Sequence, residues 1–178
     1  MGLDMFIFKI KRYSNATFDD VVAVRSYLDL QEYKKEHPGY KCSFAQWSGR
    51  KKVPPVELVK YYQPMYEEGL IQEVAYWRKA NAVHKWFVDN VQDGEDDCSA
   101  HRELTREDLE ELRDLAHQVR CNPDLAEKLL PTESGFFFGG TQYDDWYFEG
   151  IENTVDQLDK VLKETDFETE ALYYVSSW

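Results

Sequence analysis

The sequence has few cysteines and no long apolar run. Its 178 residues include only three cysteines, and no segment approaches the roughly 18 consecutive apolar residues that a membrane span requires. The first residues lack the basic start and the small-residue cleavage site of a signal peptide. Sparse cysteine without an export signal is typical of reduced thiols in a cytoplasm. We therefore expect a cytoplasmic protein that does not insert into a membrane.

Catalytic signatures are also missing. The chain contains no G-x-S-x-G nucleophile motif, no phosphate-binding P-loop and no H-E-x-x-H zinc motif. The sequence therefore predicts a protein that is not an enzyme. A hydrolase that uses His84 and Asp144 is the least favoured alternative.

Basic residues become scarce in the second half of the chain. Residues 89–178 carry 7 basic and 24 acidic side chains, whereas residues 1–88 carry 14 basic and 10 acidic ones. A negative field of this size repels nucleic acid and attracts basic protein surfaces. It indicates either a solvated surface or a face that binds the basic groove of a partner protein. The residues expected to form such a face are Glu107, Glu110, Glu111 and Asp114.

Apolar and aromatic residues are abundant by contrast, at 43% and 15% of the chain. A disordered chain is poorer in both, so we expect a folded core. The length suits one domain, which we place at residues 1–178.

The spacing of apolar residues predicts an α+β fold. Alternation over residues 3–11 indicates a strand with one buried face, and residues 171–175 indicate a second strand. Residues 18–36 leave helix and strand both open, and residues 40–56 suggest a loop. We expect three to four helices packed on a small sheet that contains both termini. Helical spacing or capping signals predict helices at 70–92, 105–120 and 144–164.

Two cysteines and two histidines lie close together in the sequence: Cys98, His101, His117 and Cys121. Zn²⁺ prefers sulfur and imidazole nitrogen in a tetrahedron, so this set suits a zinc site. If a helix starts at Thr105, His117 lies roughly 18 Å along its axis, and residues 98–104 must fold back to close the site. A three-ligand variant would use His84 instead of the later pair. The alternative is buried cysteines and exposed histidines without a metal.

Polar side chains interrupt the apolar face of the predicted helix at 70–92. Asn81 and His84 fall on that face with Trp77, and buried polar groups need hydrogen-bonding partners. Residues 141–147 could supply them, which would make either a structural lock or the floor of a pocket. In a pocket, cations could meet phosphates while aromatic rings stack a base. The expected ligand site or polar network comprises Trp77, Arg78, Asn81, His84, Tyr143 and Asp144, with Lys79 as a further cation.

Four segments resemble a family of small proteins from bacteriophages and prophages. These are MGLDM at the start, WRKANAVHKWF, DGEDDC and GFFFGGTQYDDWY, and the resemblance extends from Met1 to about Leu162. It implies a phage setting more than a mechanism. Three of the four zinc candidates lie outside the family pattern, which counts against a family-wide zinc role. The positions that the resemblance marks are Trp77, Arg78, Asn81, His84, Cys98, Gly135, Gly139, Tyr143 and Asp144.

Small acidic phage proteins of this kind often act against host defences, and anti-CRISPR proteins bind basic clefts of a nuclease. We therefore expect first an inhibitor of a host defence protein, such as a Cas nuclease, that acts through an acidic surface. Such a protein would bind neither nucleic acid nor membranes directly. The alternative is a small-molecule binder that sequesters a signalling nucleotide.

Overall fold

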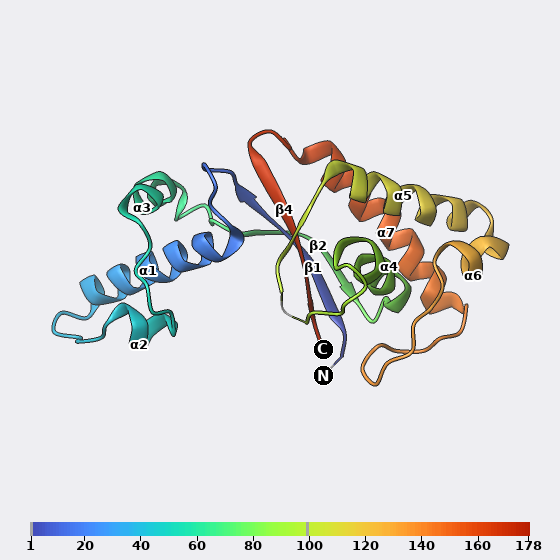
Figure 1. The fold of residues 1–178 in the computed structure, drawn as a ribbon, viewed down its shortest axis with the longest axis horizontal. Helices are drawn as coiled ribbons and strands as arrows, with labels where there is room; N and C mark the ends of the chain where they lie inside the picture. Colours follow the sequence, from blue (N-terminus) through green and yellow to red (C-terminus); the bar gives the residue numbers. More distant parts are fainter. Residues whose placement is uncertain (1, 99) are drawn as a thin grey trace. The chain divides into compact units, whose positions relative to one another are not determined.

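The computed structural model describes residues 2–98 and 100–178 (Figure 1). The described residues form seven α-helices and one four-stranded antiparallel sheet, which confirms the expected α+β class. The strands follow one another in the order β2-β1-β4-β3, so the strands nearest the two ends of the sequence are neighbours at the centre of the sheet. They are β1 (Asp4–Lys11), β2 (Gln72–Arg78), β3 (Arg102–Leu104) and β4 (Glu170–Ser177).

The chain divides into two compact units. Unit 1 comprises Met1–Lys9 and Glu73–Trp178, and unit 2 comprises Ile10–Gln72. A single domain over residues 1–178 stays a prediction. No helix among the described residues is both long enough and apolar enough to cross a membrane.

Unit 2 consists of three helices and a short 3-10 turn. The segment that the sequence left undecided is helical because Thr17 and Asp20 form a capping box, in which each side chain binds the backbone N–H of the other residue. A second capping box, from Ser43 to Gln46, starts a short helix within the stretch expected to be a loop. The elements are α1 (Phe18–Glu36), α2 (Phe44–Ser48), α3 (Val56–Tyr62) and η1 (Gln63–Met65).

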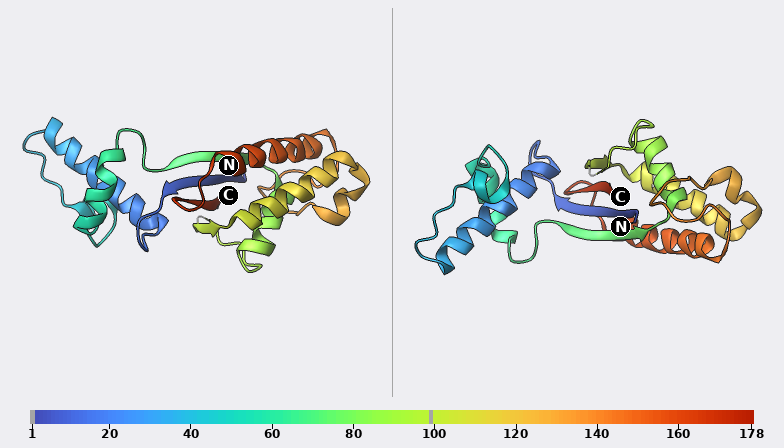
Figure 2. Two further views of the ribbon diagram at one scale, coloured as in Figure 1. Left: turned by 90° about the horizontal axis from the view of Figure 1, so that it is seen from above. Right: turned by 90° about the horizontal axis from the view of Figure 1, so that it is seen from below.

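Unit 1 packs its helices and its strands around one core. The core combines residues of β1, β2 and β4 with the apolar stripes of three long helices. Two of these helices, α5 and α7, lie side by side in all views (Figure 2). The predicted starts of α5 and α7 are confirmed, because Thr105 caps α5 with Asp108 and Asp144 caps α7. The elements are α4 (Asn81–Val91), α5 (Arg106–Cys121), η2 (Pro123–Leu125), α6 (Ala126–Leu129) and α7 (Asp145–Glu164).

The single helix predicted over residues 70–92 is wrong. Its first part is β2, in which Ala75 and Trp77 are buried while Tyr76 and Arg78 are exposed, a period of two. The chain then turns at Lys79, whose φ of 57° lies in the left-handed region, and α4 begins at Asn81. The β-branched and aromatic residues of this stretch favoured the strand.

Candidate functional site

A pocket of about 450 Å³ lies in unit 1 where α4 begins. Its walls come from residues 78–83 at the junction of β2 and α4, from the segment 139–142, and from the first turns of α7. The sequence had singled out both the junction and the glycine-rich segment. The structure brings them together with α7 around one cavity.

The junction between β2 and α4 depends on a close approach between two backbone segments. The backbone N–H of Lys79 donates to the carbonyl of Leu3 at 2.8 Å, which holds the left-handed residue at the sheet. Gly139, with φ at +93°, crosses beside it, and a Cβ at that position would lie 3.2 Å from Cβ of Lys79. Glycine is therefore required at position 139 for both its φ and its lack of a side chain.

Asn81 fixes the segment that forms one wall of the pocket. Its side chain is 4% exposed, and its Nδ2 donates to the carbonyls of Phe138 at 3.2 Å and Gly140 at 2.8 Å. Its Oδ1 accepts from the backbone N–H of Glu133 at 3.1 Å. Sequence reasoning expected these partners from residues 141–147, whereas the preceding segment supplies them. Asn81 is thus a structural lock and also a wall residue of the pocket.

The first turn of α4 lines the pocket and has no side-chain cap. The first N–H groups of any helix lack an acceptor within the helix. In α1, α5 and α7 a side chain accepts one of them, but no side chain caps α4, whose N-cap residue is Ala80. Residues 80–83 line the cavity. The positive end of the α4 dipole therefore lies at one wall of the pocket, where it would favour an anion.

Charged side chains add to this positive end. Arg78 is 57% exposed, and its Nη1 lies 3.4 Å from Oδ1 of Asp4. Lys79 is exposed and forms no ion pair within the described part of the chain. The carboxylate in the lining belongs to Asp144, which accepts from the backbone N–H of Tyr147 at 3.2 Å as the α7 cap. The lining thus contains two cations and one carboxylate, although Arg78 also pairs with Asp4 and unit 1 as a whole carries 11 basic and 26 acidic side chains.

Aromatic residues line the α7 side of the pocket. Trp146 lines it while remaining 81% exposed. Tyr147 is half-buried and donates its hydroxyl to the carbonyl of Leu130 at 2.8 Å, and burial raises the pKa of this phenol. Tyr143 lies outside the lining, and its ring meets that of Tyr147 edge to face at 4.9 Å. Sequence reasoning named Tyr143 and missed Trp146.

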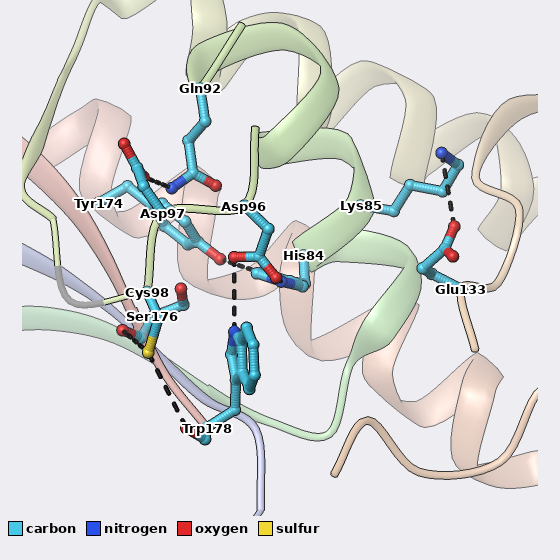
Figure 3. A network of polar contacts seen from close by, with 10 residues as sticks. All are labelled: His84, Lys85, Gln92, Asp96, Asp97, Cys98, Glu133, Tyr174, Ser176 and Trp178. Carbon is cyan, nitrogen blue, oxygen red and sulfur yellow. Dashed lines mark hydrogen bonds and ion pairs between the residues drawn. The ribbon is translucent and has the colours of Figure 1, made fainter. Parts of the chain in front are cut away.

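His84 belongs to a buried polar network that does not line the pocket (Figure 3). Its ring is 1% exposed, with Nδ1 lying 2.7 Å from the hydroxyl of Tyr174 and Nε2 lying 3.1 Å from Oδ2 of Asp96. The other oxygen of Asp96 accepts from Nε1 of Trp178 at 3.4 Å. Burial, and then the Asp96 carboxylate, raise the pKa of Tyr174 well above its usual range. The network connects α4, the loop after it and β4.

The partners of His84 are not the residues 141–147 that the sequence predicted. The carboxylate beside His84 is that of Asp96, whereas Asp144 caps α7, so the structure does not bring the His84 and Asp144 pair of the hydrolase alternative together. Trp77, also expected at the site, lies in the core and donates its Nε1 to Thr154 at 2.9 Å. Of the six expected ligand residues, the pocket is lined by Arg78, Asn81 and Asp144.

The four zinc candidates do not form one cluster. His117 and Cys121 are neighbours on α5, with the sulfur 3.8 Å from Nδ1. The Cys98 sulfur lies instead 3.9 Å from the carbonyl of Ser176, on β4. The segment that had to fold back along α5 contains β3, which pairs with β4, and this pairing places His101 at the sheet. Across residues 2–98 and 100–178, no group of three His, Cys, Asp or Glu side chains is arranged to hold a metal ion.

The acidic residues expected to bind a partner lie on α5. Glu107, Glu111 and Asp114 are exposed, and Glu110 is half-buried with its carboxylate 3.5 Å from Arg106. Basic residues are interspersed among them. Arg113 binds both Asp114 and Asp159 of α7, at 2.8 Å and 2.9 Å. The acidic surface therefore extends over both helices and is partly neutralised by arginine.

Comparison of the chain with protein-family models, with curated proteins and with solved structures found no match. The resemblance to phage and prophage proteins therefore stays a prediction.

Proposed function

We propose that unit 1 binds a small phosphorylated ligand in the pocket at the start of α4. The observation that carries this proposal is the uncapped first turn of α4, which lines the pocket together with Arg78 and Lys79. The cavity of about 450 Å³ lies within the range of roughly 300–1,000 Å³ that is usual for small-molecule sites.

The chemistry of these groups suits a phosphate. Backbone N–H groups at a helix start bind phosphate oxygens directly, with the helix dipole favouring the negative charge. Arg78 adds a planar pair of donors, and Lys79 adds a compact charge. The pocket's carboxylate, Asp144, disfavours a ligand that is anionic throughout and accepts hydrogen bonds from hydroxyl or amino groups. The ligand thus combines one anionic end with a polar, uncharged part.

Binding rather than conversion fits the arrangement. The carboxylate in the lining already accepts a backbone hydrogen bond as a helix cap, and His84 lies in the buried network outside the lining. Neither is placed as a general base toward a bound ligand. We propose that the protein holds its ligand and lowers the free concentration of that ligand in the cell.

Calorimetric titration tests this proposal with inorganic phosphate, pyrophosphate and ribose 5-phosphate as probes. Replacing Lys79 by Gln is expected to weaken binding about tenfold, which corresponds to about 1.4 kcal/mol. The matched control is Lys160→Gln, which removes an exposed cation of the same unit that does not line the pocket. Absence of binding by the unaltered protein, or equal loss in both variants, contradicts the proposal.

A second candidate function rests on the acidic surface of α5 and α7. Exposed carboxylates gather on two helices that lie side by side, and an acidic face of this kind complements a basic protein groove. With the resemblance to phage proteins, this supports an inhibitor of a host defence protein, such as a Cas nuclease, acting in the host cytoplasm. The contact would be between proteins, because the field of unit 1 repels nucleic acid.

Capture of the nuclease by the purified protein tests this second candidate at about 150 mM and about 500 mM salt, since screening weakens charge pairing. Reversing Glu107, Glu111 and Asp114 to Lys is expected to abolish capture at the lower salt. Reversing three exposed acids of unit 2, Glu57, Glu67 and Glu68, is the control. No complex with the unaltered protein at the lower salt ends this candidate.

A further inference from the structure

We infer that the ligand of the α4 pocket is a free nucleoside phosphate whose base stacks on Trp146. This inference rests on the proposed phosphate site and names the class of its ligand. It begins from an unusual side chain: Trp146 lines the pocket and yet is 81% exposed. A large apolar ring left in water beside a cavity is typical of a binding surface.

The position of Trp146 relative to the phosphate end is set by helix packing. Asp144 caps α7 through the N–H of Tyr147, which fixes the first turn that carries the tryptophan. One turn further, a Cβ built at Gly150 lies 4.0 Å from Cβ of Ala80, the residue directly before α4. The chain directly before α4 therefore passes close to the second turn of α7, where only a glycine side chain stands between them. The start of α4 and Trp146 line the same cavity, so one small ligand could contact both.

Polar groups of the lining fit the part of a nucleotide between phosphate and base. Asp144 accepts hydrogen bonds, which suits ribose hydroxyls or the amino group of a base, and Gln142 can both donate and accept. A sugar phosphate would satisfy these groups and the cations while leaving the indole in water. The exposed indole thus favours a ligand with an aromatic group.

The charge of unit 1 distinguishes a free nucleotide from the end of a nucleic acid strand. The unit carries 26 acidic and 11 basic side chains, and the two cations of the lining are local exceptions. Each further phosphate of a strand would extend into this negative field, where it is repelled. We therefore assign the site to the free nucleotide.

Titration of the full chain with ribose 5-phosphate, with AMP, GMP and UMP, and with a short oligonucleotide bearing a 5′-phosphate tests the inference. At least one nucleoside monophosphate is expected to bind about tenfold or more tightly than ribose 5-phosphate, because base stacking on an aromatic ring is strong and tolerant of sequence. The oligonucleotide is expected to bind more weakly than that nucleotide. Equal or tighter oligonucleotide binding would overturn the assignment to a free ligand.

The decisive variant is Trp146→Ala, with Trp146→Phe as a conservative replacement. The alanine variant is expected to bind nucleotide and ribose 5-phosphate equally, and the phenylalanine variant to retain part of the preference. Phe136→Ala is the matched control, because Phe136 is 96% exposed in the same unit but does not line the pocket. This control is expected to bind nucleotides as the unaltered protein does.

The outcomes separate the two proposals. Binding of ribose 5-phosphate that depends on Lys79, together with nucleotide binding unchanged by Trp146→Ala, overturns the base assignment and leaves the phosphate site standing. Absence of binding by every probe overturns both. Loss of nucleotide and ribose 5-phosphate binding to the same extent in Trp146→Ala also overturns the base assignment.

Discussion

The side-chain amide of Asn81 lies 2.8 Å from the carbonyl oxygen of Gly140, across 59 residues of sequence. Through this bond and two others, the first residue of α4 holds the glycine-rich segment over the pocket. One buried amide therefore determines both the local fold and the shape of the candidate site.

Replacing Asn81 by Ala is expected to destabilise unit 1 by about 2–4 kcal/mol, because it leaves buried backbone groups without partners. Urea-induced unfolding measures this change. Asn90→Ala is the control on the same helix, where the exposed Asn90 donates one hydrogen bond to Trp86. A loss no larger than that of the control would show that Asn81 does not lock the segment.

Gly139→Ala is expected to cost more stability than Gly94→Ala, and also to weaken binding of ligands to the pocket. Both glycines have positive φ, at 93° and 79°, so both substitutions carry the strain of a left-handed alanine. A Cβ meets Lys79 at 3.2 Å in the first case and nothing within 4 Å in the second. The two losses in unfolding free energy are expected to differ by about 1 kcal/mol or more. This difference measures the steric clash between the new Cβ at position 139 and Lys79, because the strain of the positive φ is common to both variants. If both variants lost the same unfolding free energy, the close approach of Gly139 to Lys79 would not contribute to stability.

Stability is expected to fall as the pH rises above about 10, the usual pKa of tyrosine. The pKa of Tyr174 is raised in the folded protein. Its contribution to the free energy of unfolding is therefore complete below about pH 10. Above that pH the contribution declines, because the tyrosine loses its proton in the unfolded chain but keeps it in the folded protein. The loss amounts to about 1.4 kcal/mol per pH unit for each such group. Unfolding measured between neutral and alkaline pH should therefore show a shallower decline in Tyr174→Phe. If stability declined equally steeply in the unaltered protein and in Tyr174→Phe, the raised pKa of Tyr174 would not be the cause.

Metal analysis of protein purified without a His tag tests the zinc hypothesis. Structural zinc sites take four protein ligands, whereas the described residues bring together only His117 and Cys121 of the four candidates. We expect far less than one zinc per chain, and no change in melting temperature with a chelator. About one zinc per chain, with a chelator-sensitive melting temperature, would show that the other two candidates reach α5 in solution.

Local signals in the sequence predicted most of unit 1. The strand at 3–11 followed from alternation, a strand at 171–175 was also expected, and two helix starts followed from capping residues. These signals depend on neighbours within a few residues. A single helix was wrongly predicted over residues 70–92, because a short apolar run fits the period of a strand nearly as well as that of a helix. Its turn depends on Lys79, whose left-handed φ no sequence pattern indicated.

The sequence predicted some of the residues of the candidate site but not their partners. The polar residues at the start of α4 stood out because they interrupt an apolar stripe. Their partners did not, since Asn81 and His84 bind groups that lie 12 to 90 positions away. The sequence did not single out Trp146 either. The chain has five tryptophans, and only the folded structure shows which of them is exposed. The zinc hypothesis stays a prediction, but the strand β3 between the two candidate pairs could not be seen from the spacing of the ligands.

The order of the strands has a consequence for synthesis. β4 lies between β1 and β3, yet it is the last strand to leave the ribosome. Until residues 170–177 emerge, β3 has no neighbour in the sheet and one edge of β1 stays open. A nascent chain stalled before that point would expose unpaired strand edges, so we expect unit 1 to complete its fold only once translation has passed β4.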